Sequence, residues 1–206
     1  MLMQSAPEFR GITIRSLALR AFIAGAALVL MGTLTAFATR TALATGPQHE
    51  LQPSPIADLP LFTLPDLDGR EVKLADAAAD IVLVHFFATW CEPCREELTS
   101  LSALSKSSEA NRWRIIAVNV GEVPARVRRF LETTPVPFEV LLDGNRAVTK
   151  AWGVTILPTT YVLDASKRGR LLVEGDIDWM QPSVREALKR SSPTGPNDTT
   201  QLGREK

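Results

Sequence analysis

The sequence predicts an α/β domain built on a mixed central sheet with helices on both faces. Residues 81–87 and 113–120 are two nearly continuous apolar runs with the length and composition of buried strands. Between them, residues 92–109 place leucines three positions apart in an otherwise polar segment, which indicates an amphipathic helix. A strand–helix–strand unit of this kind crosses over right-handedly, so its two strands are expected to be parallel.

A short hairpin is expected to precede this unit, and the rest of the sheet to follow it. Residues 61–64 and 71–74 flank Asp66-Leu67-Asp68-Gly69, whose glycine favours a tight turn. Apolar spacing and turn residues predict the later elements. These are a helix at 124–133, a strand at 138–142, a brief helix at 145–152, an antiparallel hairpin of strands 159–163 and 170–174, and a last helix at 181–190.

The chain divides into four segments by composition. Its 206 residues suit one domain of ordinary size with tails. Residues 1–46 are expected to be a signal anchor or signal peptide, and the proline-containing residues 47–58 an extended linker. Residues 59–190 are expected to form the folded domain. Residues 191–206 lack apolar periodicity, which predicts a disordered tail.

The amino-terminal segment has the composition of an export signal. Three arginines precede the uncharged residues 21–38, which as a helix would reach about 27 Å, close to the hydrocarbon thickness of a bilayer. This length favours an uncleaved membrane anchor, although Ala36-Phe37-Ala38 and Ala42-Leu43-Ala44 both fit signal peptidase. Either way, the domain is expected on the periplasmic side of a bacterial inner membrane, anchored there or released by cleavage.

Charge and cysteine content narrow the class of function. Lysine plus arginine and aspartate plus glutamate number 23 each, so the basic patch that nucleic-acid binding requires is not expected. The chain has only two cysteines, and the loop between Cys91 and Cys94 is too short to join distant parts of a fold. These cysteines are therefore expected to do chemistry, in a protein that we expect to be monomeric.

The cysteines lie where a buried strand is expected to meet a helix. Backbone N–H groups at a helix amino end favour negative charge, so Cys91 is expected to be the nucleophilic thiolate and the more exposed sulfur. Cys94 lies one turn deeper and would resolve a mixed disulfide. Pro93 suits a first helical turn. Neither Glu92 nor Pro93 can donate a positive charge to Cys91, which argues for a disulfide reductant rather than a strong oxidant.

Other interpretations of the cysteine pair fit less well. Haem attachment needs a histidine after the second cysteine, where the chain has Arg95. A zinc site needs two more ligands, and His49 and His85 are isolated in the sequence. No metal site is therefore predicted, and a redox-active Cys91–Cys94 disulfide serves in place of a cofactor. A structural disulfide and metal binding by the pair are the remaining alternatives.

Two further residues stay open on pattern alone. Glu97 follows Cys94 by three positions and so shares its helix face. If buried it would have a raised pKa and could accept a proton from Cys94, and the alternative is a solvated carboxylate. Pro158 immediately precedes a predicted strand, where an ordinary trans proline is tolerated.

Two longer motifs resemble a known family. Residues 86–97, Phe-Phe-Ala-Thr-Trp-Cys-Glu-Pro-Cys-Arg-Glu-Glu, and residues 153–164, Gly-Val-Thr-Ile-Leu-Pro-Thr-Thr-Tyr-Val-Leu-Asp, resemble the TlpA/ResA-like thiol-disulfide oxidoreductases. These belong to the thioredoxin superfamily, among the redoxin or AhpC/TSA-like proteins. The resemblance implies a thioredoxin-like fold with an N-terminal β-hairpin extension.

The resemblance also implies roles for individual residues. Cys91 matches the family's nucleophile, Cys94 its resolving cysteine and Glu97 an acidic residue near the active site. Pro158 matches a cis-proline that faces the dithiol and lets the preceding backbone pair with a client. The residues expected to contact a client are Trp90, Glu92, Pro93, Leu157 and Pro158.

His85 departs from the family, which often has asparagine there, whereas thioredoxins tend to have a buried aspartate. It is interpreted as a satisfied core histidine, with proton transfer to Cys94 as the alternative. The function implied is an enzyme that reduces client disulfides, for example in apocytochrome c, and is recharged by an upstream membrane thiol reductant. The alternatives are a reductant of a copper site, or a copper metallochaperone, in cytochrome oxidase assembly.

Overall fold

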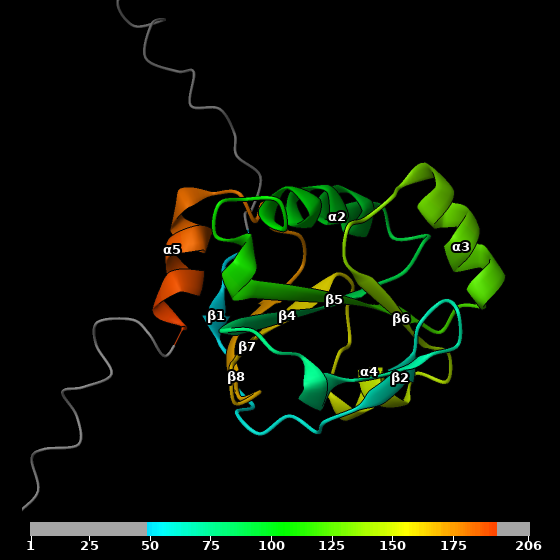
Figure 1. Ribbon diagram of the computed structural model, residues 1–206, viewed down its shortest axis with the longest axis horizontal. Coiled ribbons are helices and arrows are strands. Elements are labelled where there is room, and N and C mark those ends of the chain that lie inside the picture. The colour runs from blue at the N-terminus through cyan, green and yellow to red at the C-terminus, as the bar shows by residue number, and fades with distance from the viewer. Residues whose placement is uncertain (1–48, 193–206) are drawn as a thin grey trace, which may run out of the picture. The chain divides into compact units, whose positions relative to one another are not determined.

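The computed structural model describes residues 49–192 and contains a six-stranded sheet in the order β1-β8-β7-β4-β5-β6 (Figure 1). The strands are β1 Gln52–Pro53, β2 Thr63–Pro65, β3 Glu71–Lys73, β4 Ile81–Phe87, β5 Trp113–Val120, β6 Glu139–Asp143, β7 Thr159–Asp164 and β8 Gly169–Glu174. The helices are α2 Glu92–Leu104, α3 Pro124–Thr133, α4 Ala147–Ala151 and α5 Pro182–Arg190, with 3-10 turns η1 Leu74–Asp76 and η2 Ala110–Arg112.

The predicted export signal at residues 1–46 lies outside the described residues, as does the predicted tail from residue 193 onward. Within residues 49–192, none of the helices has the length and apolarity that crossing a membrane requires.

The sheet is mixed, as the sequence predicts. β4 pairs in parallel with β5, which pairs in parallel with β6. On its other side β4 pairs antiparallel with β7, and β8 and β1 continue antiparallel to the edge. All seven residues of β4 are buried, because a central strand covered on both faces has no side chain in water. This buried strand ends just before the cysteine motif and so fixes its position.

Two apolar layers cover the sheet, one on each face (Figure 1). On one face α2 and α5 pack together through residues such as Leu101, Leu104 and Leu188, and α3 contributes Val127 and Phe130 beside Leu98 of α2. The other layer, with α4 and the β2–β3 hairpin, is centred on the fully buried Trp152. The predicted helices on both faces are confirmed.

The predicted N-terminal hairpin forms a separate two-stranded sheet. β2 and β3 pair antiparallel, with Leu64 opposite Val72. The turn between them uses Gly69 at a φ of +82°, a conformation that residues with a Cβ rarely adopt. Asp66 closes the turn by accepting hydrogen bonds from the backbone N–H groups of Asp68 and Arg70 at 2.8 and 2.9 Å.

The helix predicted at 92–109 is shorter than expected. It ends at Leu104, and a separate 3-10 turn follows at residues 110–112. Serine hydroxyls compete with the backbone here, since Ser102 and Ser105 donate to the carbonyl oxygens of Leu98 and Ser102 at 2.7 and 2.8 Å. The apolar spacing also stops at Leu104, so the polar residues beyond it gain no burial from staying helical.

The interpretation of residues 47–58 as a linker needs correction. Gln52 and Pro53 form β1 and pair with Leu172 and Leu171 of β8. An edge position tolerates a proline, because one side of the strand needs no hydrogen-bond donor. The proline-rich composition therefore predicts extended chain correctly, but this chain is the outermost strand of the main sheet.

Candidate active site

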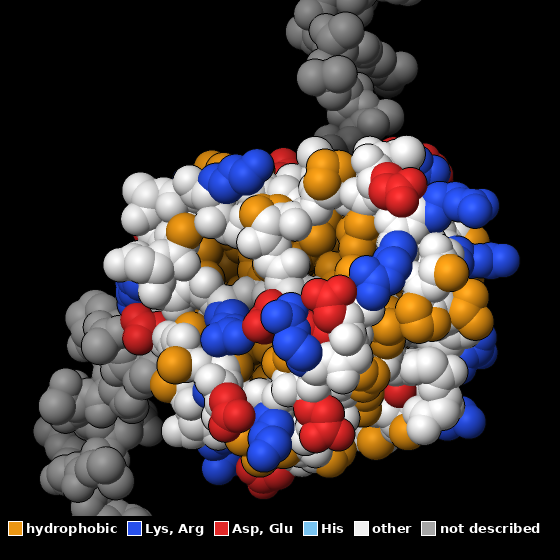
Figure 2. All heavy atoms as spheres, turned by 45° about the vertical axis from the view of Figure 1, so that its right-hand side comes forward, with side chains coloured by type: hydrophobic (Ala, Val, Ile, Leu, Met, Phe, Trp, Pro, Cys, Tyr) orange, Lys and Arg blue, Asp and Glu red, His pale blue; other side chains and the backbone are white. Residues whose placement is uncertain are grey.

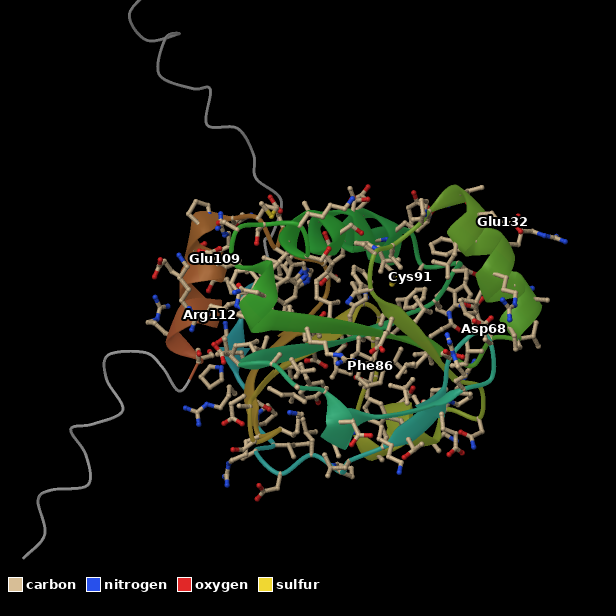
Figure 3. The ribbon with its side chains drawn as sticks, in the orientation of Figure 1. Asp68, Phe86, Cys91, Glu109, Arg112 and Glu132 are labelled. Carbon is tan, nitrogen blue, oxygen red and sulfur yellow. A yellow bond between two sulfur atoms is a disulfide. The ribbon has the colours of Figure 1, made fainter. Side chains whose placement is uncertain are left out.

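The connection from β4 to α2 carries a disulfide between Cys91 and Cys94 (Figure 3). Cys91 is the N-cap residue of α2, and its Sγ accepts a hydrogen bond from the backbone N–H of Cys94 at 3.3 Å. Cys91 is 5% exposed and Cys94 is fully buried, which is the order that the sequence predicts. After reduction, the backbone N–H groups of the first turn of α2, including that of Cys94, would stabilise a thiolate on Cys91.

The segment before β7 lies against this disulfide. The Leu157–Pro158 peptide bond is cis, as the resemblance implies. Leu157 packs against the apolar cluster that contains both cysteines, and Pro158 is buried at the start of β7. The Pro158 carbonyl accepts the N–H of Gly175 at 2.8 Å, which ties this segment to the chain after β8. The structure thus brings Leu157, which forms the cis peptide bond with Pro158, to the apolar cluster that contains the dithiol, and the contact of both residues with a client stays a prediction.

The rim of the site exposes apolar side chains. Trp90 is 67% exposed and Ile156 48%, one from each of the two segments that meet at the disulfide. Glu92 and Pro93 are exposed on the first turn of α2. Figure 2 shows one face of the molecule, where apolar side chains are exposed among charges of both signs. Such a rim suits contact with an unfolded or extended protein segment rather than with a polyanion.

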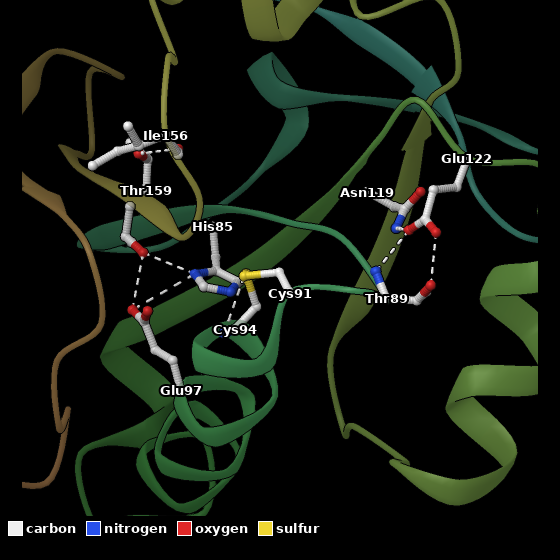
Figure 4. The surroundings of a disulfide bond; sticks show 10 residues. His85, Thr89, Cys91, Cys94, Glu97, Asn119, Glu122, Ile156 and Thr159 are labelled. Carbon is white, nitrogen blue, oxygen red and sulfur yellow. Dashed lines mark hydrogen bonds and ion pairs between the residues drawn. A yellow bond between two sulfur atoms is a disulfide. The ribbon is translucent and has the colours of Figure 1, made fainter.

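A buried polar cluster lies on the other side of the disulfide (Figure 4). His85 Nδ1 lies 2.9 Å from Thr160 Oγ1 and 3.7 Å from Glu97 Oε1. Glu97 Oε1 accepts hydrogen bonds from Thr160 Oγ1 at 3.3 Å and from Trp179 Nε1 at 2.6 Å. The four residues come from β4, α2, β7 and the segment before α5, so the tertiary fold assembles the cluster.

Burial sets the protonation of this cluster. It raises the pKa of Glu97 to about 8, although the hydrogen bonds from Trp179 and Thr160 oppose the shift. Burial also lowers the pKa of His85 to about 3. At neutral pH Glu97 is therefore mainly a neutral acid and His85 a neutral imidazole, so their contact is not an ion pair. The sequence-based expectation that a buried Glu97 has a raised pKa agrees with this geometry.

Glu122 is a part of the site that the sequence reasoning missed (Figure 4). Its side chain is only 5% exposed and accepts hydrogen bonds from the Thr89 backbone N–H at 2.7 Å and the Thr89 hydroxyl at 2.6 Å. Asn119 Nδ2 donates to it at 2.7 Å. Because Thr89 immediately precedes Trp90, Glu122 holds the loop that presents Cys91. Its place just after parallel strand β5, beside the end of β4, is the signal that could have revealed it.

Replacing Glu122 with glutamine is expected to lower the free energy of unfolding by about 1–3 kcal/mol, since the hydrogen bonds from Thr89 and Asn119 would then go to a neutral amide, a weaker acceptor than a carboxylate. Chemical denaturation measures the loss. Glu132→Gln, at an exposed carboxylate on the nearby α3, is the matched control and should change stability by less than about 0.5 kcal/mol. Equal stabilities for the two variants would show that Glu122 does not hold the loop.

Within residues 49–192, no three His, Cys, Asp or Glu side chains come together as a set that could hold a metal ion.

A cysteine disulfide that begins a helix, with a cis-proline segment packed against it, defines a thiol-disulfide oxidoreductase of the thioredoxin-like class. The AhpC/TSA family model matches residues 56–169, more than half of the chain, and the chain belongs to this family.

Individual relatives agree with this class. The thiol-disulfide oxidoreductase ResA of Geobacillus thermodenitrificans is 31% identical over 157 residues, which cover 76% of this chain and 83% of the relative. ResA of Bacillus subtilis is 35% identical over 119 residues, which cover 58% of this chain and 66% of the relative. A Chlorobium tepidum structure, described as a candidate thiol:disulfide interchange protein DsbE, superimposes with a TM-score of 0.58 at 27% identity, covering 68% of this chain and 96% of that one. The thioredoxin-like fold is confirmed.

Proposed function

We propose that this oxidoreductase works as a reductant that breaks disulfides in client proteins outside the cytoplasm. The observation that carries the proposal is the surrounding of Cys91. Among the described residues, the hydrogen bond to its Sγ comes from the backbone N–H of Cys94 alone, and the neighbouring Glu92 is an exposed carboxylate paired with Arg95 at 3.5 Å. A dithiol is strongly oxidising when its reduced form is strongly stabilised, and within residues 49–192 no side chain donates a hydrogen bond to the Cys91 Sγ that would add such stabilisation.

The reaction needs both cysteines. The Cys91 thiolate attacks a client disulfide and forms a mixed disulfide, with one client sulfur leaving as a thiolate. Cys94 then attacks Cys91, which releases the second client sulfur and leaves the Cys91–Cys94 disulfide. The client gains two electrons, and an upstream membrane dithiol must return two electrons to the protein. We expect the exposed side chains of Trp90 and Ile156, together with the backbone before Pro158, to hold the client segment during the exchange.

The export signal predicted at residues 1–46 supports a location on the periplasmic side of the inner membrane. There a reductant serves proteins whose cysteines must stay reduced against an oxidising environment. Apocytochrome c, which needs free thiols for haem attachment, is the client that we propose.

Trapping with Cys94→Ser tests this function. The variant should hold its client on Cys91 as a mixed disulfide that is recovered intact from cells and released by added thiol. Cys91→Ser, which differs only in which cysteine remains, is the matched control and should recover none. Recovery of the same proteins with both variants, or of none with either, would contradict the proposed reaction.

The direction of electron flow is tested by the reduction potential of the Cys91–Cys94 pair. We expect a value well below the roughly −120 mV of a strong oxidant such as DsbA, measured by equilibration with glutathione buffers. A potential close to that of DsbA would show that the protein oxidises its clients instead.

A further inference from the structure

His85 has one ring nitrogen without a protein partner. The side chain is fully buried, and Nε2 makes no hydrogen bond among the described residues. Leaving a buried polar group unpaired costs on the order of 1–3 kcal/mol, so a native orphan of this kind requires an explanation. Figure 4 shows the imidazole between Glu97 and the disulfide, with Nε2 on the side of the sulfurs.

The hydrogen bonds on the other ring nitrogen determine which one carries the proton. The Thr160 hydroxyl has a single proton and donates it to Glu97 Oε1. It must therefore accept at its 2.9 Å contact with His85 Nδ1, which makes Nδ1 the donor. In the neutral ring Nε2 is then a bare lone pair. In Figure 4 this unprotonated nitrogen is on the side of the ring toward the disulfide, the side from which a Cys94 thiol would approach after reduction.

We propose that His85 relays the proton of Cys94 to Glu97 during resolution of the mixed disulfide. This inference rests on the proposed function. It assigns a role in that reaction to His85, a position at which this chain departs from its family.

The relay balances in atoms and electrons. As Cys94 Sγ bonds to Cys91 Sγ, the bond from Cys91 to the client sulfur breaks and its electron pair leaves on the client. The Cys94 proton passes to His85 Nε2. The Nδ1 proton passes to the Thr160 hydroxyl, which gives its own proton to Glu97 in the molecules whose Glu97 is ionised, a fraction that grows as the pH approaches the Glu97 pKa of about 8. The client thiolate takes a proton from water.

The environment of Glu97 suits it to end this relay. Its pKa of about 8 lies close to the ordinary value of a thiol, about 8.5, so little free energy is needed to move the proton. The low pKa of His85 means that the imidazole holds the extra proton only in passing. Among the described residues, the Asp176 carboxylate also acts on Glu97, and its negative charge raises the pKa of Glu97 further.

The resolution step can be followed without any client. The reduced full chain is treated with an aromatic disulfide that releases a coloured thiolate. Attack by Cys91 releases the first equivalent, and attack by Cys94 on the resulting mixed disulfide releases the second. His85→Gln is expected to slow the second release about 100-fold at neutral pH and leave the first unchanged. The wild-type rate should level off near the pKa of Glu97, whereas the variant's rate should keep rising.

The chain offers a matched control, because His49 is its only other histidine and lies near the surface, 3.2 Å from the Asp176 carbonyl oxygen. His49→Gln should keep both rates and the wild-type pH profile. A second release in His85→Gln with the wild-type rate and profile would overturn the relay. Because only this internal step is measured, that result would leave the proposed reduction of clients standing, and failure to reduce clients would not by itself affect the relay.

A measurement on the unchanged chain covers the case in which His85→Gln fails to fold. Nitrogen-15 NMR of the imidazoles gives two histidine spin systems, and the buried one should show a protonated Nδ1 and a bare Nε2 in the reduced protein. A proton on Nε2 at neutral pH would overturn the relay, because Cys94 would then have no acceptor.

Discussion

Glu97→Gln is expected to stabilise the oxidised protein above pH 8 by on the order of 5 kcal/mol, while leaving its stability near pH 5 almost unchanged. The figure follows from a pKa raised from 4.5 to about 8 by burial, at about 1.4 kcal/mol for each unit. Above pH 8 the wild-type fold must hold a carboxylate in an apolar interior, whereas glutamine stays neutral and can still accept from Trp179 and Thr160. Urea denaturation across pH measures the difference.

Whether stability rises or falls with pH depends on two buried groups, Glu97 and His85, whose pKa values are shifted in opposite directions. Between pH 4.5 and about 8, folded Glu97 holds a proton that the unfolded chain has lost, so its contribution to stability falls as pH rises. His85, lowered from 6.5 to about 3, has the opposite effect, and its contribution rises with pH between those values. The two contributions oppose each other between pH 4.5 and 6.5. The net loss of stability is therefore expected from about pH 6.5 to 8.

The matched control is Glu96→Gln, at the exposed neighbour of Glu97 on α2. This variant should keep the wild-type decline above pH 6.5, whereas Glu97→Gln should abolish it. If the stability of Glu97→Gln falls as steeply above pH 6.5 as that of Glu96→Gln, the buried Glu97 does not cause the decline.

The elements nearest the site were predictable because their patterns are local. The apolar run of β4, the cysteine spacing and Pro93 together indicate a buried strand that ends at a helix amino terminus, and the structure has this arrangement. The true end of α2 at Leu104 is also where the apolar spacing stops, so the predicted helix continued to residue 109 beyond its own apolar pattern, into a segment where serine hydroxyls bond to backbone carbonyls. β1 was missed for a different reason, since its two residues gain their pairing only from β8, which lies far along the chain.

The buried part of the site depends on contacts that no local pattern reveals. Trp179 lies 82 residues from Glu97 in sequence, and Thr160 lies 75 from His85. His85 therefore looks isolated in the sequence, although a threonine and a carboxyl group lie beside it in the fold. Glu122 and Thr89, 33 residues apart, meet because two parallel strands end at the same edge of the sheet. Tertiary topology thus supplies the proton chemistry around a dithiol that the sequence identifies.

Cys91 and Cys94 are expected to differ sharply in thiol reactivity when each is the only cysteine in the protein. Cys91→Ser and Cys94→Ser should both lose turnover of protein disulfides, down to the rate of the added thiol by itself, because one exchange step is missing in each. The rate at which the remaining thiol is alkylated should distinguish the two variants. Iodoacetamide should react with Cys91 in Cys94→Ser at least about tenfold faster than with Cys94 in Cys91→Ser, measured at neutral pH on reduced protein.

The reason is the geometry of the first turn of α2. Cys91 receives the N–H of Cys94 and retains some exposure, whereas Cys94 is fully buried behind it. In denaturant the two variants should be alkylated at equal rates, because only the fold distinguishes the thiols. Equal rates in the native state would mean that helix and burial do not activate Cys91. The nucleophile would then be chosen by the client's approach rather than by the protein's own structure.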